Sequence, residues 1–139
     1  MSTADVARNK AAIIERCVHR ARDVYGGIDA NLTDDLTRQD SIILNIQRAC
    51  EAAVDLAMHL VRGHRLGIPQ DSRHAFDLLA DAGKLDRALS DVLKRMVGFR
   101  NVAVHDYQDL SVDIVRAILQ RHLDDLLTFA RLGLGVASG

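Results

Sequence analysis

The stretch Ile42-Ile43-Leu44-Asn45-Ile46-Gln47-Arg48-Ala49-Cys50 begins the longest apolar pattern in this chain. Apolar residues recur from it at alternating steps of three and four, at Ile43, Ile46, Cys50, Ala53, Ala57 and Leu60. This spacing is typical of a helix that packs along another helix, as in a coiled coil. A second stripe of Ile42, Ala49 and Leu56 predicts that the helix is covered on two sides. We therefore expect a helix over about residues 38–62 to form the centre of the core and part of a dimer contact.

The flanking sequence supplies the remaining helices of the predicted fold. Thr37-Arg38-Gln39-Asp40 resembles a capping box at the start of the central helix, with Asp where Glu or Gln is usual, and an acidic loop precedes it. Apolar spacing and helix-ending residues predict four more helices over about residues 9–25, 72–82, 86–105 and 111–132. No stretch has the pattern of a strand. The sequence therefore predicts an all-α, antiparallel helical bundle of about five helices. It would form a single domain over residues 1–139, with loose ends at about 1–8 and 133–139.

The composition is that of one globular domain with an aliphatic core. The chain has 139 residues, of which 48% are apolar, and this excludes an intrinsically disordered chain. Cys17 and Cys50 both fall in apolar helical patterns, which favours buried free thiols in a reducing compartment over a disulfide. No apolar run approaches the roughly 20 residues of a membrane helix, and the start of the chain lacks an apolar signal region. We therefore expect a cytoplasmic protein with no membrane partner.

The charge is nearly balanced overall but unevenly distributed. A net charge of −1 argues against a uniformly basic nucleic-acid binder. Residues 84–100 carry five basic and two acidic side chains, a local excess of +3, whereas residues 101–125 carry two basic and five acidic ones, giving −3. The positive excess therefore ends at Arg100. Ordinary solvated helix faces would produce the same distribution, so both interpretations stay open.

The residues best suited to chemistry lie together in Arg100-Asn101-Val102-Ala103-Val104-His105-Asp106-Tyr107. Arg100 can hold phosphate oxygens through its bidentate fork, and His105 can transfer a proton near neutral pH. Asn101 can orient a hydroxyl or a phosphate, and Tyr107 can donate a hydrogen bond or receive a transferred group. This set of side chains suits a reaction at a phosphodiester.

The spacing of Arg100 and His105 limits how the two side chains could meet. Residues five apart on a regular helix point about 140° away from each other. Either the helix ends between the two residues, so that His105 turns back, or two copies of the motif meet across a symmetric contact. A purely structural interpretation also stays open, in which Arg100 holds a helix end and His105 caps the last carbonyls.

The pattern Arg-x4-His-x-Tyr within residues 100–107 resembles the signature of the HEPN family (higher eukaryotes and prokaryotes nucleotide-binding). It is most similar to the HepT branch, the toxin half of two-component toxin–antitoxin systems. The segments 40–52, 66–70 and 94–101 also resemble that branch, so the similarity extends over most of the chain, from about Lys10 to Phe129. The resemblance implies a dimeric helical fold.

The resemblance also implies a metal-independent ribonuclease whose active site lies in the cleft between two subunits. His105 would then transfer protons, Arg100 would hold the non-bridging phosphate oxygens, and Asn101 would position the phosphate or the 2′-hydroxyl. The expected substrate is RNA, either tRNA or mRNA, because RNA carries its own nucleophile in the 2′-hydroxyl. DNA is not expected as a partner.

The resemblance further implies a partner, a minimal nucleotidyltransferase that acts as the antitoxin. Tyr107 looks like the residue that accepts AMP from it, forming O-AMP-tyrosine, and the added phosphates would block the site beside His105. The alternative is that Tyr107 only packs on the last helix. Arg48 and Glu51 either pair with each other at the surface or lie behind the cleft as supporting residues, and the sequence does not separate these two interpretations.

Two other functions remain compatible with the same residues, namely a non-catalytic nucleotide- or substrate-binding partner of a nucleotidyltransferase and a dimeric scaffold. The sequence has no metal or cofactor motif. His59 and His64 are five apart, which does not make a zinc pair, and His122 with Asp125 is one isolated i,i+3 pair. No Gly-x4-Gly-Lys phosphate loop occurs. We therefore expect no metal and no cofactor.

Overall fold

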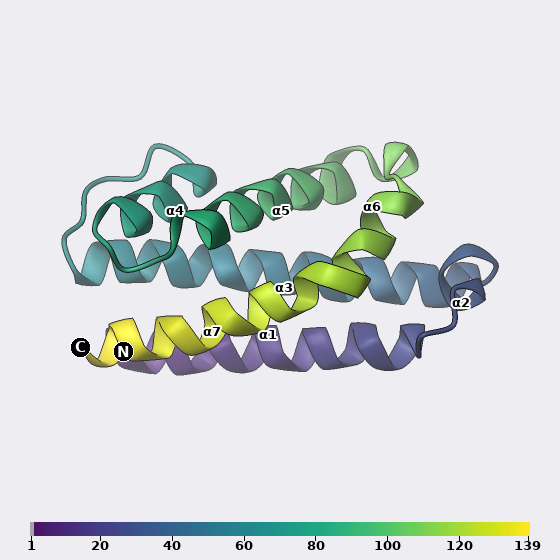
Figure 1. Ribbon diagram of the computed structural model, residues 1–139, viewed down its shortest axis with the longest axis horizontal. Coiled ribbons are helices and arrows are strands. Elements are labelled where there is room, and N and C mark those ends of the chain that lie inside the picture. The colour runs from purple at the N-terminus through teal and green to yellow at the C-terminus, as the bar shows by residue number, and fades with distance from the viewer. Residues whose placement is uncertain (1) are drawn as a thin grey trace.

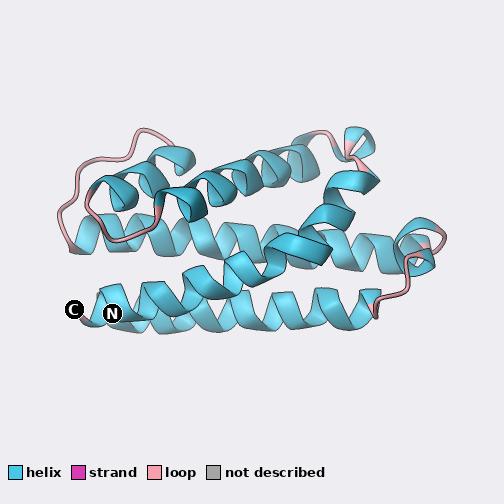
Figure 2. Ribbon diagram, in the orientation of Figure 1, coloured by secondary structure: helices cyan, strands magenta, loops and turns pink. Residues whose placement is uncertain are grey.

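The computed structural model describes residues 2–139, and this part of the chain is built from helices without any strand (Figure 2). The elements in chain order are α1 (Thr3–Tyr25), α2 (Ala30–Thr33), α3 (Leu36–Gly63), α4 (Ser72–Asp81), α5 (Arg87–His105), the 3-10 turn η1 (Tyr107–Asp109), α6 (Val112–Ala117), the π-helical segment η2 (Ile118–His122) and α7 (Leu123–Ser138). The prediction of an all-α bundle is confirmed.

Helix α3 is the centre of the bundle, as its two apolar stripes predict. It runs the length of the molecule and packs against α1, α4, α5 and α7 (Figure 1). Every residue of both stripes is buried, with Ile42, Ala49 and Leu56 fully inaccessible to solvent. Because neighbours cover α3 on two sides, only a narrow strip of this helix reaches solvent, and that strip carries Leu44 and Arg48.

Both ends of the chain are helical, so the expected loose ends at 2–8 and 133–139 are wrong; Met1 lies outside the described residues. Ser2 and Asp5 form a reciprocal capping box that starts α1 six residues earlier than expected. Gly133 does not end the last helix. A Cβ at this position would lie 2.6 Å from Cδ2 of Leu56, so the missing side chain lets α7 approach α3 closely.

The start of α3 also differs from the prediction. Asp35, rather than Thr37, caps this helix, because the Asp35 carboxylate accepts a hydrogen bond of 3.0 Å from the backbone N–H of Arg38. The expected acidic loop contains the one-turn helix α2, which is anchored by the fully buried Leu32. The other predicted starts are confirmed, with Asp71, Asp86 and Ser111 at the N-termini of α4, α5 and α6.

The expected last helix is present, but a π-helical segment over Ile118–His122 interrupts it. Segments of this kind are rare and frequently occur at functional sites. Here the segment forms one wall of a pocket against α5. Within residues 2–139, no helix combines the length and the apolar content needed to cross a bilayer.

Candidate active site

The eight-residue motif lies at the C-terminal end of α5 and in the turn that follows. Helix α5 stays regular through His105, and the backbone N–H of Asp106 closes it with a bond of 2.8 Å to the carbonyl of Val102. The interpretation that the helix ends between Arg100 and His105 is therefore wrong. The two side chains leave one helix in directions about 140° apart. A symmetric contact between two copies of the motif would bring the two groups together, and this arrangement stays a prediction.

Arg100 is partly buried at the contact between α5 and α3, and its guanidinium has no carboxylate partner among residues 2–139. Its Nε donates a hydrogen bond of 3.0 Å to Oδ1 of Asn101. Burial raises the pKa of the neighbouring Cys50 thiol to about 12, although the positive charge of Arg100 opposes this rise. The Asn101 contact uses only Nε, so the two terminal nitrogens of Arg100 remain free to bind an anion.

His105 is exposed at the end of α5, beside Val104, which is 47% exposed. Within the described chain, the His105 imidazole makes no hydrogen bond, and the Arg100 side chain binds no helix-end carbonyl. The structural interpretation, in which these two residues secure a helix end, is therefore wrong. The imidazole is accessible for proton transfer to a bound substrate.

Tyr107 begins the turn η1, and its hydroxyl donates a hydrogen bond to the carboxylate of Asp40 at the start of α3. Partial burial and the Asp40 carboxylate together raise the pKa of Tyr107 to about 12. The phenol is therefore protonated at neutral pH, while 41% of the residue remains exposed to solvent. Tyr107 packs on the start of α3 rather than on the last helix, which corrects the alternative considered for it.

Arg48 and Glu51 lie on the exposed strip of α3 but do not pair with each other. Glu51 accepts a hydrogen bond of 3.2 Å from Nε2 of Gln47, and Arg48 turns toward α1. The interpretation as a surface ion pair is therefore wrong. The charges of Glu51 and Arg100 act on the pKa of the Cys50 thiol in opposite directions, since Glu51 raises it and Arg100 lowers it.

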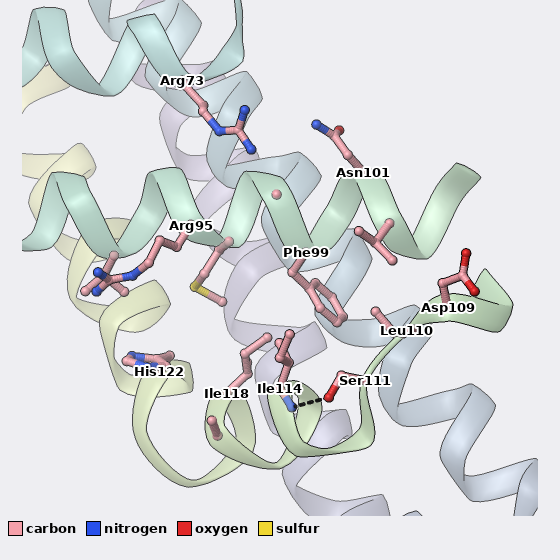
Figure 3. A pocket seen from close by; sticks show the side chains of 15 residues that line it. Arg73, Arg95, Phe99, Asn101, Asp109, Leu110, Ser111, Ile114, Ile118 and His122 are labelled. Atoms are coloured by element: carbon pink, nitrogen blue, oxygen red, sulfur yellow. Dashed lines mark hydrogen bonds between the residues drawn. The ribbon is translucent and has the colours of Figure 1, made fainter. Parts of the chain in front are cut away.

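A pocket of about 690 Å³ opens between α5 and the segment from η1 to η2 (Figure 3). Its floor is apolar, with Phe99 projecting from α5 toward the connector and Ile114 and Ile118 facing it from α6 and η2. Asn101 lines the pocket and also accepts the hydrogen bond from Arg100. Neither Arg100 nor His105 lines the pocket. The hydrogen bond between Asn101 and Arg100 is therefore the link between the pocket and the candidate site.

The family described as Ribonuclease HepT-like matches residues 14–132 of the chain. The chain belongs to the HepT-like ribonuclease family. It is 51% identical over 125 residues to the mRNA nuclease HepT of Shewanella oneidensis, and the match covers 90% of this chain and 93% of the relative. The resemblance to the HepT branch is confirmed.

Solved structures of HepT-like proteins share the fold. A structure described as the tri-AMPylated Shewanella oneidensis HEPN toxin in complex with MNT antitoxin superposes with a TM-score of 0.87 at 50% identity, covering 92% of this chain and 96% of that chain. A crystal structure of a toxin–antitoxin with AMP-PNP also gives a TM-score of 0.87, at 49% identity, with coverage of 93% and 98%. The helical bundle is thus that of a HepT-like toxin.

Sequence reasoning missed two features of this HepT-like site. Asp40 holds the Tyr107 hydroxyl although the two residues are 67 positions apart, so the motif itself carried no sign of the contact. The local positive excess over residues 84–100 is also partly neutralised, because Asp77 of α4 binds Lys94 at 2.8 Å and Arg87 at 3.4 Å. The positive charge of this segment therefore does not extend as a free patch to Arg100.

Proposed function

We propose that this HepT-like chain is a metal-independent endoribonuclease toxin that acts as a symmetric homodimer. The proposal rests on two side chains of α5, Arg100 and His105. A guanidinium without a carboxylate partner and an exposed imidazole without a hydrogen bond leave one helix end in different directions. Neither group is used to hold the fold together. In a two-fold dimer, Arg100 of one protomer would face His105 of the other across one RNA strand.

The chemistry follows from these side chains. His105 removes the proton from the 2′-hydroxyl of RNA, and the 2′-oxygen forms a bond to phosphorus while the bond to the 5′-oxygen breaks. The leaving oxygen takes a proton from water or from the second imidazole, and a cyclic phosphate remains. The terminal nitrogens of Arg100 bind the non-bridging oxygens as negative charge develops. Asn101, through its bond to Nε, holds the guanidinium in position.

The proposed antitoxin is a minimal nucleotidyltransferase that transfers AMP to Tyr107. The relative described as a tri-AMPylated toxin in complex with MNT antitoxin supports this assignment. In the transfer, the Tyr107 oxygen forms a bond to the α-phosphorus of a nucleoside triphosphate, and pyrophosphate leaves. Asp40, which already accepts the Tyr107 hydrogen bond, receives the proton. Phosphates placed two residues from His105 would repel the substrate phosphate and block its access.

Cleavage of mRNA in the presence of chelator tests the proposal. We expect Arg100→Ala and His105→Ala each to lower the rate about 10²–10³-fold, the scale for loss of one transition-state hydrogen-bond donor. Arg87→Ala, on the same helix but paired with α4, and His19→Ala, exposed on α1, serve as matched controls and should cleave normally. Unchanged cleavage by the double Arg100→Ala, His105→Ala variant would contradict the proposal. Nucleotide binding without any cleavage would favour a non-catalytic binding partner.

Subunit mixing tests whether the site is composite. When Arg100→Ala and His105→Ala protomers are mixed and exchanged, half of the dimers are mixed, and each mixed dimer carries one intact site out of two. Activity should then return to about a quarter of the wild-type value. A site built within one protomer would give no recovery, because each protomer would still lack one of its two groups.

A further inference from the structure

A shallow groove of about 390 Å³ runs between α1 and α3 and is lined by three arginines that form no ion pair within residues 2–139. Arg16 and Arg20 line it from α1, and Arg48 lines it from α3. All three arginines are exposed. We call this feature the α1–α3 groove.

The three arginines of the groove form no ion pair, although Glu51 and Asp55 also line it. No carboxylate within residues 2–139 lies within 4.0 Å of any of these guanidiniums. Elsewhere on α1, Arg8 pairs with Asp5 and Arg22 pairs with Asp124. Three unpaired arginines thus share one groove, whereas Lys10, which also lines it, pairs with Asp55 at 3.2 Å.

The same three guanidiniums lie near one buried side chain, that of Cys17. Burial raises the pKa of the Cys17 thiol in the floor of the groove, and the charges of all three arginines oppose this rise. Arg16 and Arg20 are one helical turn apart on the same face, where like charges repel. Such a cluster is unfavourable in the free protein and becomes favourable when an anion neutralises it.

The groove also contains an unsatisfied hydrogen-bond acceptor. Asn45 lines it and is only 5% exposed. Its Nδ2 donates to the carbonyl of Ser41 at 2.9 Å, whereas its Oδ1 has no partner within the described part of the chain. Buried polar atoms are rarely left in this state. This oxygen has less than 1 Å² of accessible surface, so the exposed arginines determine what the groove can bind, and they favour a ligand with negative charge.

We propose that the α1–α3 groove binds the sugar-phosphate backbone of RNA on one side of the cleaved linkage. Phosphates match the guanidinium forks, and a sugar-phosphate backbone repeats this charge along its length, so that one strand can contact several arginines. Helix α3 links the groove to the candidate site, because Glu51 lines the groove and the adjacent Cys50 lies close enough to Arg100 for the guanidinium charge to act on its thiol. This inference rests on the proposed ribonuclease function and adds a second contact region for the same strand.

RNA binding measured against salt concentration tests the groove. Fluorescence anisotropy with a labelled single-stranded RNA would compare two double variants in a His105→Ala background, which prevents cleavage. Arg16→Gln, Arg20→Gln should weaken binding at least tenfold. It should also reduce the slope of log K against log salt by about 1.4, since each lost phosphate contact removes about 0.7 for a single strand. Arg8→Gln, Arg22→Gln removes the same charge from the same helix and should leave both quantities unchanged.

Two outcomes would overturn the inference. Equal weakening by both double variants would show a general charge effect rather than a groove. Normal RNA binding by Arg16→Gln, Arg20→Gln together with lost binding of the nucleotidyltransferase would show that the groove holds a protein. Absence of cleavage by the wild type would count against the proposed function alone, because the anisotropy measurement does not depend on cleavage.

Substrate length provides a second test in cleavage-competent protein. The groove variant should cleave a dinucleotide, which spans only the reacting linkage, at the wild-type kcat/KM. It should cleave a long RNA with kcat/KM lowered about tenfold. An equal loss on both substrates would contradict a separate binding region and would instead indicate a disturbed active site.

Discussion

The end of α5 and the α1–α3 groove carry the same kind of side chain but differ in how they are assembled. At the end of α5, all the proposed catalytic groups lie within eight consecutive residues, 100–107. In the groove, Arg16 and Arg20 meet Arg48 only because α1 and α3 pack together. Neither region uses its arginines to hold the fold. A site formed by consecutive residues can be recognised in the sequence, whereas a site formed by two helices can be recognised only once the packing of those helices is known.

Arginines elsewhere in the molecule show what distinguishes both regions. Arg116 binds Asp29 through two hydrogen bonds of 2.7 and 2.9 Å and also binds Asp113, which raises its pKa. Arg87 is paired with two carboxylates of α4. These residues join elements of the fold, and their guanidiniums are occupied. The presence or absence of a counter-charge, rather than the position in the sequence, separates structural arginines from those available to a ligand.

The first prediction separates the catalytic role of Arg100 from the RNA-binding role of the groove. Arg100→Lys keeps the positive charge but loses the planar fork, so kcat should fall at least tenfold while RNA affinity stays within about twofold of the wild type. The groove variant Arg16→Gln, Arg20→Gln should show the reverse, with affinity lost and kcat retained. Single-turnover kinetics at saturating RNA measures both. If the two variants behaved alike, the two regions would not have separate roles.

A second prediction concerns α3, which supports both regions. Gly133→Ala places a methyl group 2.6 Å from Cδ2 of Leu56 and should lower the free energy of unfolding by about 1–3 kcal/mol. Gly135→Ala meets no atom within 4 Å and should raise it by up to about 1 kcal/mol through helix propensity. Denaturant melts of the two variants measure the difference. A free energy of unfolding unchanged from the wild type in Gly133→Ala would contradict the close packing of α7 against Leu56 of α3.

The contact between Tyr107 and Asp40 gives a prediction on pH. Because the folded-state pKa of Tyr107, about 12, exceeds the ordinary value of 10, its contribution to stability is complete below pH 10 and is lost as the pH rises through 12. Asp40→Asn should lower this pKa toward 10 without reaching it, since burial is the largest cause of the shift. Phenolate absorbance, with Tyr107→Phe subtracted to remove the signal of Tyr25, follows the titration. An unchanged titration in Asp40→Asn would contradict the contact.

The smallest expected effect concerns the paired arginines that serve as controls for the groove. Arg22→Gln breaks an exposed ion pair with Asp124 and should change the free energy of unfolding by no more than about 1 kcal/mol. Thermal melts at low and high salt should nearly coincide for this variant and the wild type. A larger loss would mean that α1 depends on this pair, and another paired arginine would then be needed as the control.

Much of the fold followed from local patterns. Alternating steps of three and four predict the central place of α3, and the predicted starts of α4, α5 and α6 near residues 72, 86 and 111 are confirmed. The predictions are wrong where a contact with another helix overrides the local preference of a residue. A glycine at position 133 favours the end of the last helix, but α7 continues through it because its small size allows the contact with Leu56 of α3.

The helical class, the membership of the HepT branch and the residues of the motif follow from the sequence alone, because each depends on side chains close together along the chain. The contact between Asp40 and Tyr107 and the groove shared by three arginines become visible only in the folded chain. These features depend on which helix faces pack together and on where counter-charges lie. Both follow from the balance of burial and charge over the whole molecule, which no short stretch of sequence contains.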